Sequence, residues 1–343
     1  MNTPDIRATI QKEMQAAFPA AEARVETFYG MMEYHLGWRD VDLRPAHSDP
    51  GKLLRPQLAL LACAAVGGTV AQAFPLAAAL QLIHDFSLIH DDIEDDSDTR
   101  RGRVTVWKQW GLAHGINTGD GMFVIAHLAL LRLLEAGVPA EVILAVVKRF
   151  EETILTICEG QYLDLSFEGN LTIDEADYLA MIGRKTAVLI SSAAGLGAMV
   201  GGADPESCRD LFDFGLNVGL AFQIEDDRLG IWGDPAVTGK PRAADIYRRK
   251  VSLPIVHALR HADNCDDLAR IYQQAQVSDD DVTCALAVLE AAGSRDYSGK
   301  VAARYHTEAL QSLGRVRVGA APEAQAAFAQ IQAIAENLLG RQA

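Results

Sequence analysis

The sequence lacks the features of an exported, membrane-spanning or nucleic-acid-binding protein. Its N-terminal residues are amphipathic and mixed in charge, without the apolar run that characterises a signal peptide. The most apolar stretch, residues 58–66, is too short to cross a bilayer. The formal net charge is -15, whereas binding to a phosphate backbone needs a basic face. We therefore expect no transmembrane segment and no nucleic-acid partner.

Cysteines are few and follow no pattern. The five cysteines are scattered and include no C-x-x-C pair: Cys63, Cys158, Cys208, Cys265 and Cys284. An odd number of unpatterned cysteines is typical of reduced thiols in a reducing compartment. We therefore expect a cytoplasmic protein.

Several catalytic motifs are also missing. The Gly239-Lys240 pair lacks the upstream glycine of a phosphate-binding P-loop. The sequence contains no G-x-S-x-G, no H-E-x-x-H and no EF-hand loop. A function must therefore be sought in other groups of residues.

Helical periodicity dominates the chain, and strand-like alternation is nearly absent. Helix starts are indicated at Thr172-x-x-Glu175, Ser278-x-x-Asp281 and Asp204-Pro205. The first of these helices is expected to reach residues 201–202. Residues 77–89 are apolar around most of a helix and predict a buried central helix. No linker rich in proline, serine or glycine separates two halves, so the sequence predicts one all-α domain, residues 1–343, with ten or more helices.

Two aspartate clusters each follow an apolar helical run. The first is Asp91-Asp92-Ile93-Glu94-Asp95, and the second is Asp226-Asp227. On a helix, Asp91 and Asp95 lie one turn apart, about 6 Å along the axis, while Asp92 points partly away. Oxygen ligands favour magnesium, which fills its remaining positions with water and substrate phosphate. The alternative for each cluster is a charged helix end in water.

Basic residues follow both clusters and also precede the first. They are Arg100, Arg101, Lys185, Lys240 and Lys250, with Lys52 and Arg55 upstream. Arginine offers a bidentate fork to phosphate and lysine a point charge, although any one of them alone is usually a surface cation. Acidic and basic groups together suggest two phosphate subsites, one of them bridged by metal. Residues 230–250 are expected to form a long loop or broken segment, either a surface connection or a closure over phosphate.

The motifs LIHDDIEDDSDTRRG, GKLLRP, FQIEDDRLG and RRKVSLP together resemble those of the trans-isoprenyl diphosphate synthases, or polyprenyl synthetases. The resemblance extends over residues 51–254. It implies the all-α isoprenoid synthase fold, with helices around a central cavity, usually as a homodimer. It also implies transfer of a dimethylallyl, geranyl or farnesyl group from its allylic diphosphate to isopentenyl diphosphate, with three Mg²⁺ ions.

The resemblance assigns roles by position. Metal binding would fall to Asp91, Asp92, Asp95, Asp226 and Asp227. The allylic diphosphate would be held by Arg100, Lys185, Thr186, Gln223, Lys240 and Lys250, and isopentenyl diphosphate by Lys52, Arg55, His84 and Arg101. The residues expected to be catalytic are Asp91, Asp95, Asp226, Lys185 and Lys240. Gln161, Asp164 and Phe222 would line the reaction chamber together with Thr186 and Gln223.

The chain departs from the family pattern at two positions. The second motif normally reads D-D-x-x-D, but Gly230 takes its last position, with Asp245 as a candidate substitute. We expect weaker binding of the third ion as a result. In the R-R-G-x-P stretch, Val104 replaces proline.

The length of the product would depend on residues just before the first motif. Here the aromatic Phe86 is followed by the small Ser87. This pattern resembles that of family members that stop at geranylgeranyl diphosphate. The alternative for Phe86 is ordinary core packing. Other hypotheses are a farnesyl or longer-chain synthase, a terpene cyclase, a non-catalytic partner subunit, and an HD-type hydrolase with His84 and His90 as metal ligands.

Overall fold

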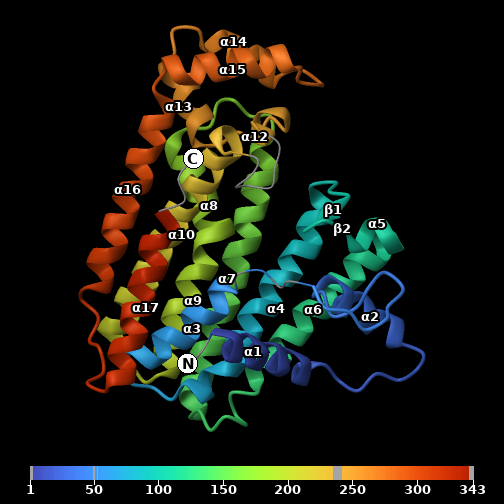
Figure 1. Ribbon diagram of the computed structural model, residues 1–343, viewed down its shortest axis with the longest axis vertical. Helices are drawn as coiled ribbons and strands as arrows, with labels where there is room; N and C mark the ends of the chain where they lie inside the picture. Colours follow the sequence, from blue (N-terminus) through green and yellow to red (C-terminus); the bar gives the residue numbers. More distant parts are fainter. Residues whose placement is uncertain (1–2, 49–50, 52, 235–241, 340–343) are drawn as a thin grey trace. The chain divides into compact units, whose positions relative to one another are not determined.

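The computed structural model describes residues 3–48, 51, 53–234 and 242–339. Its contacts divide the chain into two compact units, whose elements are labelled in Figure 1. Unit 1 comprises Met1–Val147, Leu196–Ala203 and Gly319–Ala324, and unit 2 comprises Lys148–Gly195, Asp204–Val318 and Gln325–Ala343. A single domain over residues 1–343 stays a prediction.

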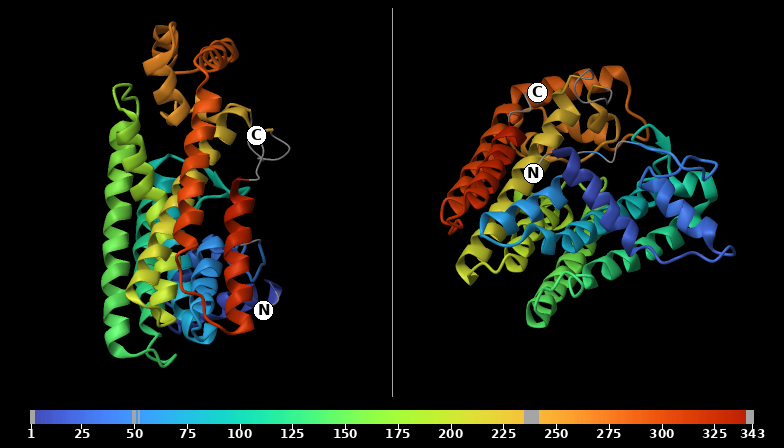
Figure 2. Two further views of the ribbon diagram at one scale, coloured as in Figure 1. Left: turned by 90° about the vertical axis from the view of Figure 1, so that its left-hand side faces the viewer. Right: turned by 60° about the horizontal axis from the view of Figure 1, so that its bottom comes forward.

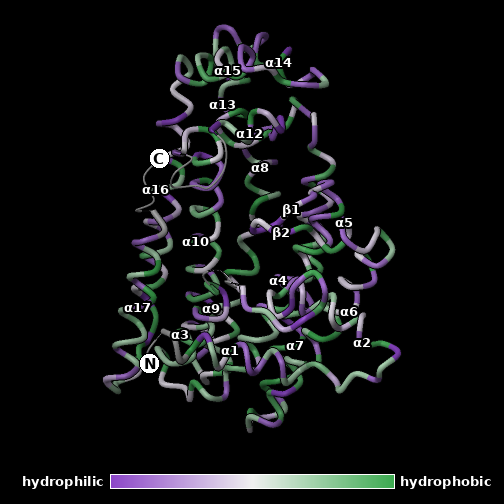
Figure 3. Tube along the Cα trace, turned by 45° about the vertical axis from the view of Figure 1, so that its right-hand side comes forward, coloured by the Kyte–Doolittle hydropathy of each residue, from purple (hydrophilic) through white to green (hydrophobic). Residues whose placement is uncertain are grey.

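Unit 1 is built mainly from the N-terminal elements. They are α1 (Thr3–Ala17), α2 (Glu26–His35), α3 (Leu54–Ala65), α4 (Val70–Glu94), β1 (Thr99–Arg100), β2 (Arg103–Val104), α5 (Val106–Trp110) and α6 (Leu112–Leu131). Helix α4 packs against α3 and α6. Strands β1 and β2 form an antiparallel hairpin just after α4, and Figure 3 colours this hairpin mostly as hydrophilic.

The remaining elements lie wholly or partly in unit 2. They are α7 (Ala140–Phe167), α8 (Glu175–Ile182), a π-helical turn η1 (Gly183–Ala187), α9 (Val188–Val200), α10 (Pro205–Trp232), α12 (Ala244–Tyr247), α13 (Leu253–His261), α14 (Cys265–Tyr272), α15 (Asp279–Ala291), α16 (Ser294–Leu313) and α17 (Pro322–Leu339). Helix α10 packs along α16, and α14 lies beside α15 (Figures 1 and 2). The prediction of an all-α fold with ten or more helices is confirmed.

Most helix predictions are confirmed, but one cap was wrong. Ser278 caps α15 through a capping box with Asp281, and Asp204 caps α10. The cap of α8, however, is Asp174, which pairs with Asp177, and not Thr172. An ionised carboxylate accepts from the free N–H groups more strongly than a hydroxyl does, which favours the later start.

The predicted loop at residues 230–250 was wrong for its first part. Helix α10 continues to Trp232, so Gly230 is helical, and α12 forms after the gap at residues 235–241. The buried helix predicted at residues 77–89 is confirmed for its first half. Residues 86–88 are only partly buried.

One continuous helix, Glu175–Val200, is long and apolar enough to cross a membrane. Of its most apolar window, 61% is buried inside the protein, which is typical of a core helix. This helix is therefore weak evidence for a membrane span.

Helices α9 and α10 approach closely at Gly215, where an added Cβ would lie 2.6 Å from Ser191 Cα. We expect Gly215→Ala to lower the free energy of unfolding by about 1–3 kcal/mol, because backbone must move to admit the methyl group. Urea denaturation measures this. Gly183→Ala is the matched control, because its nearest neighbour is 3.8 Å away and its φ of -59° suits alanine. We expect the control to be neutral or to gain about 0.5–1 kcal/mol. Equal losses in both variants would contradict the packing argument.

Candidate active site

The first aspartate cluster lies at the C-terminal end of α4, in unit 1. The helix ends at Glu94, and Asp95 is its C-cap residue, whose N–H donates to the Asp91 carbonyl at 2.8 Å. The Asp95 side chain is exposed, and that of Asp91 is half-buried. The predicted spacing of one helical turn is therefore kept, and both side chains have access to solvent.

Asp92 has a different environment from its neighbours, because its side chain is buried. Arg100, in strand β1, donates from Nε to Asp92 Oδ1 at 2.7 Å. Burial raises the pKa of Asp92, and the Arg100 charge opposes this rise only in part. The hairpin after α4 thus places Arg100, a predicted phosphate-binding residue, beside the first aspartate motif.

A group of cationic and imidazole side chains lies near the middle of α4. Burial and the charge of Arg55 lower the pKa of His84 well below its ordinary value, so the ring is neutral at neutral pH. Burial also lowers the pKa of Arg55, to about 10. Arg101 lies beside Gly51, where a Cβ would be 3.9 Å from its Nη2. Four residues were predicted to bind isopentenyl diphosphate. The charges of two of them, Arg55 and Arg101, act on a third, His84. The fourth, Lys52, lies outside the described residues.

Asp85 completes this group and was missed by sequence reasoning. Its carboxylate is buried, accepts from Gln81 Nε2 at 2.7 Å, and lies 3.6 Å from His35 Nε2. Burial alone would raise the pKa of Asp85, but His35, His84 and Arg101 together hold it below its usual value. The sequence shows an acidic residue within the apolar run before the first motif, at Ile83-His84-Asp85. A single aspartate, however, gives no indication of its role.

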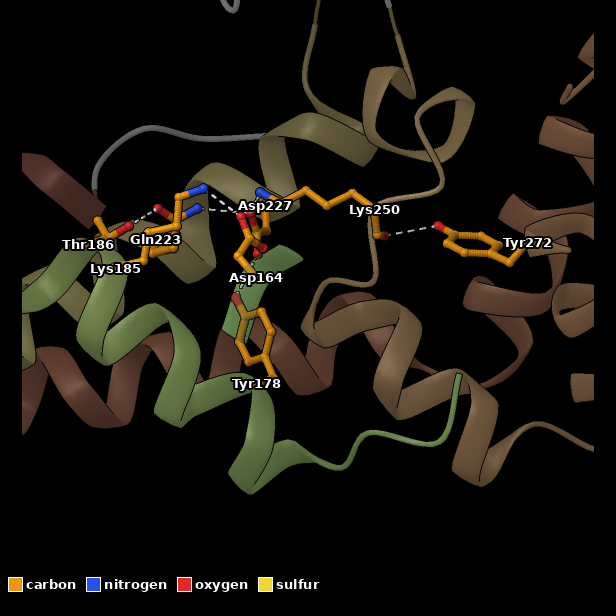
Figure 4. A network of polar contacts seen from close by, with 8 residues as sticks. All are labelled: Asp164, Tyr178, Lys185, Thr186, Gln223, Asp227, Lys250 and Tyr272. Carbon is orange, nitrogen blue, oxygen red and sulfur yellow. Dashed lines mark hydrogen bonds and ion pairs between the residues drawn. The ribbon is translucent and has the colours of Figure 1, made fainter. Parts of the chain in front are cut away.

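The second aspartate cluster, in α10 of unit 2, is organised around Asp227. Figure 4 shows three side chains converging on this fully buried carboxylate. Tyr178 donates to Oδ2 at 2.6 Å, while Gln223 at 3.0 Å and Lys250 at 2.7 Å donate to Oδ1. Burial and the Asp227 charge raise the pKa of Tyr178 well above its ordinary value, so it remains a donor. Tyr178 is the second site residue that sequence reasoning missed.

The π-helical turn η1 places two predicted residues at this site. Lys185 Nζ donates to Asp164 Oδ2 at 2.5 Å, and Thr186 Oγ1 donates to Gln223 Oε1 at 3.0 Å. Gly160 of α7 lets the backbone pass close to the turn, since a Cβ there would lie 2.2 Å from Lys185 N. Turns of this kind recur at functional sites because they redirect side chains within a helix.

Lys250 reaches Asp227 from the segment that follows α12. Its backbone carbonyl accepts a hydrogen bond from Tyr272 Oη at 3.3 Å (Figure 4). Burial would lower the pKa of Lys250, but the charges of Asp227 and Asp245 raise it above its ordinary value. Lys240 lies outside the described residues. Gln161, Phe222 and Asp226 are half-buried.

The carboxylates suit magnesium better than a metal that needs several protein ligands. Among the described residues, no group of three His, Cys, Asp or Glu side chains could hold a metal ion. Magnesium typically takes only one or two carboxylates and completes its shell with water and substrate phosphate. Asp91, Asp95 and Asp226 reach solvent, whereas Asp92 and Asp227 are buried beside cations.

The two predicted chain-length residues lie on α4 in unit 1. The Phe86 ring meets the rings of Phe123 and His90 edge to face, with centroids 5.2 and 4.9 Å apart. Ser87 Oγ donates to the His84 carbonyl at 2.8 Å. Phe86 therefore belongs to a group of aromatic rings that includes Phe123 of α6.

Comparisons with known proteins agree with the motifs. The polyprenyl synthetase family model matches residues 43–289. A geranylgeranyl diphosphate synthase of Mycobacterium tuberculosis is 40% identical over 89% of this chain and 84% of its own. A (2E,6E)-farnesyl diphosphate synthase of Mycobacterium bovis is 34% identical over 91% and 86%. The crystal structure of a polyprenyl synthetase from Streptomyces coelicolor A3(2) superposes with a TM-score of 0.87, at 33% identity, over 98% of both chains. The chain belongs to the polyprenyl synthetase family and is a prenyltransferase.

Proposed function

We propose that the enzyme joins isopentenyl diphosphate to an allylic diphosphate and so extends the prenyl chain. The observation that carries this proposal is the group of Arg55, His84 and Arg101 around buried Asp85. A terpene cyclase binds one diphosphate and does not need such a group in addition to Lys185 and Lys250. The intact first aspartate motif argues against a non-catalytic partner subunit.

Arg100, Lys185 and Lys250 would stabilise negative charge on the departing diphosphate, and we infer the same role for Lys240. The bond between the allylic carbon and oxygen breaks, and its electrons leave with the diphosphate. The double bond of isopentenyl diphosphate then attacks the allylic cation. The new carbon–carbon bond leaves a cation on the isopentenyl unit. A proton leaves the carbon next to this cation as a new double bond forms, and the released diphosphate takes that proton, so no side-chain base is required.

We propose that the enzyme would hold three Mg²⁺ ions, which would supply positive charge to neutralise phosphate. Asp91, Asp95 and Asp226 would ligate them, because their side chains are accessible and offer hard oxygen donors. Asp92 and Asp227 would support the ligands from buried positions, where Arg100 and Lys250 neutralise them.

We infer that geranylgeranyl diphosphate is the main product, with farnesyl diphosphate as the alternative. Phe86 supports this inference, because its contact with Phe123 places two aromatic rings next to the first aspartate motif. The names of the Mycobacterium relatives include both products.

We also propose a cytoplasmic homodimer. Helix α6 exposes a row of large apolar side chains: Leu112, Ile116, Val124, Leu128 and Leu131. An apolar face of this kind is typical of a surface that associates. A second copy of the chain would cover it by an isologous contact. Among the described residues, none of the five cysteines forms a disulfide, which suits a reducing compartment.

Asp91→Ala should lower turnover by about a hundredfold or more while leaving the fold intact, since the ions that would neutralise the departing diphosphate lose a ligand. Labelled isopentenyl diphosphate, each allylic starter and Mg²⁺ are incubated with the enzyme, and the products are sized. Asp263→Ala, at an exposed position, is the control. Retained activity in Asp91→Ala would contradict the metal assignment. Products made from the allylic starter alone would favour the cyclase.

Phe86→Ala should lengthen the products, because removing the ring opens space next to Phe123. The same assay, with the products separated by chain length, measures this change. Phe328→Ala removes an equal ring from α17 and should leave the product unchanged. An unchanged product in Phe86→Ala would mean that Phe86 is ordinary core packing.

The double variant Val124→Glu/Leu128→Glu should be a monomer, because it places two charges in the row on α6. Light scattering after size exclusion measures the mass. Ala303→Glu, on the exposed face of α16, should remain a dimer. A wild-type monomer, or a variant that still dimerises, would sink the proposal of a homodimer through α6.

A further inference from the structure

Gly230 has no space for a side chain. A Cβ built on it would lie 2.1 Å from Asp245 Oδ2 and 2.4 Å from Asp245 Cγ. Residue 230 follows Asp226 by one helical turn, so it shares the face of α10 that carries the second aspartate motif. The Asp245 carboxylate therefore occupies the position where a side chain from residue 230 would begin.

The surroundings of Asp245 are those of the Asp227 network. Its side chain is buried, with 7% of the residue exposed. The Asp245 charge contributes to the raised pKa values of Lys250, Tyr178 and Tyr272. Lys250 and Tyr178 are also the donors that hold Asp227. Two buried carboxylates thus share the same neighbours.

The backbone around Asp245 is held firmly. Ala243 and Ile246 are buried in the apolar core of unit 2, on either side of Asp245. The Lys250 N–H donates to the Asp245 carbonyl at 2.9 Å. Ala243 adopts a left-handed conformation with a φ of 57°, which is unfavourable for alanine and recurs at functional sites. Helix α12 therefore directs this carboxylate onto α10 despite the unfavourable backbone conformation of Ala243.

We propose that Asp245 supplies, from α12, the carboxylate that the second aspartate motif lacks at Gly230. Asp245 is then a positioning residue, which keeps Lys250 and Asp227 in register with the metal-binding Asp226. Burying a carboxylate is unfavourable unless it is compensated, and the Lys250 charge lies beside both Asp245 and Asp227. The inference rests on the proposed function in one respect, namely that magnesium and diphosphate bind at this motif.

The test exchanges the carboxylate between the two positions. The exchange variant is Gly230→Asp/Asp245→Gly, and its matched control, Gly230→Asn/Asp245→Gly, has the same size but no charge. Asp245→Asn alone removes the charge with little change of volume. Mn²⁺ replaces Mg²⁺, inorganic diphosphate is added, and bound Mn²⁺ is counted by electron paramagnetic resonance. Urea denaturation without metal reports on the fold.

We expect Asp245→Asn and the uncharged double variant to bind the weakest Mn²⁺ at least tenfold less tightly than the wild type. The exchange variant should recover most of this affinity. Wild-type affinity in Asp245→Asn, or an exchange variant no better than its uncharged control, would overturn the inference. So would a wild-type protein that binds no Mn²⁺ in the presence of diphosphate.

This readout does not depend on prenyl transfer. If the wild type extends no allylic diphosphate but the Mn²⁺ affinities follow the expected order, the proposed function fails and the role of Asp245 is supported. Urea midpoints that match the wild type in Asp245→Asn would show that its loss of affinity does not come from unfolding.

Discussion

The buried carboxylate of Asp227 constrains most of the second aspartate site. An ionised carboxylate away from water is unfavourable by an amount on the order of several kcal/mol unless donors surround it. Its donors come from α8, from α10 itself and from the segment after α12. Tyr178, Gln223 and Lys250 must therefore stay in place together. The need to surround the Asp227 carboxylate with donors thus holds these side chains together, and it also holds Lys250 in position.

Cations near each of the two aspartate motifs are likewise paired with carboxylates. Arg100 meets Asp92, Lys185 meets Asp164, and Lys250 meets Asp227. Each pair holds a flexible cation at a defined point beside an aspartate carboxylate. A net charge of -15 is thus compatible with anionic substrates, because the local charge at the motifs matters more than the total.

At Gly230, the residues present in the sequence motif differ from the groups present at that position in space. By pattern alone, the second motif lacks its last aspartate. In space, the Asp245 carboxylate reaches that position from another element. The same distinction applies to η1, where a π-helical turn sets Lys185 and Thr186 against their partners. Neither the turn nor the reach of Asp245 follows from local propensity, because both depend on how α7, α10 and α12 pack.

The sequence by itself determined the all-α class, the caps at Asp204 and Ser278, both aspartate motifs and the family. These depend on periodicity, on side chains that bond to nearby backbone, and on residue order, which are all local. Only the tertiary structure decided that Asp85 and Tyr178 belong to the sites. It also decided that Asp92 and Asp227 are buried and that Asp245 lies against Gly230. Burial and partner choice arise between segments far apart in the chain, so no local pattern encodes them.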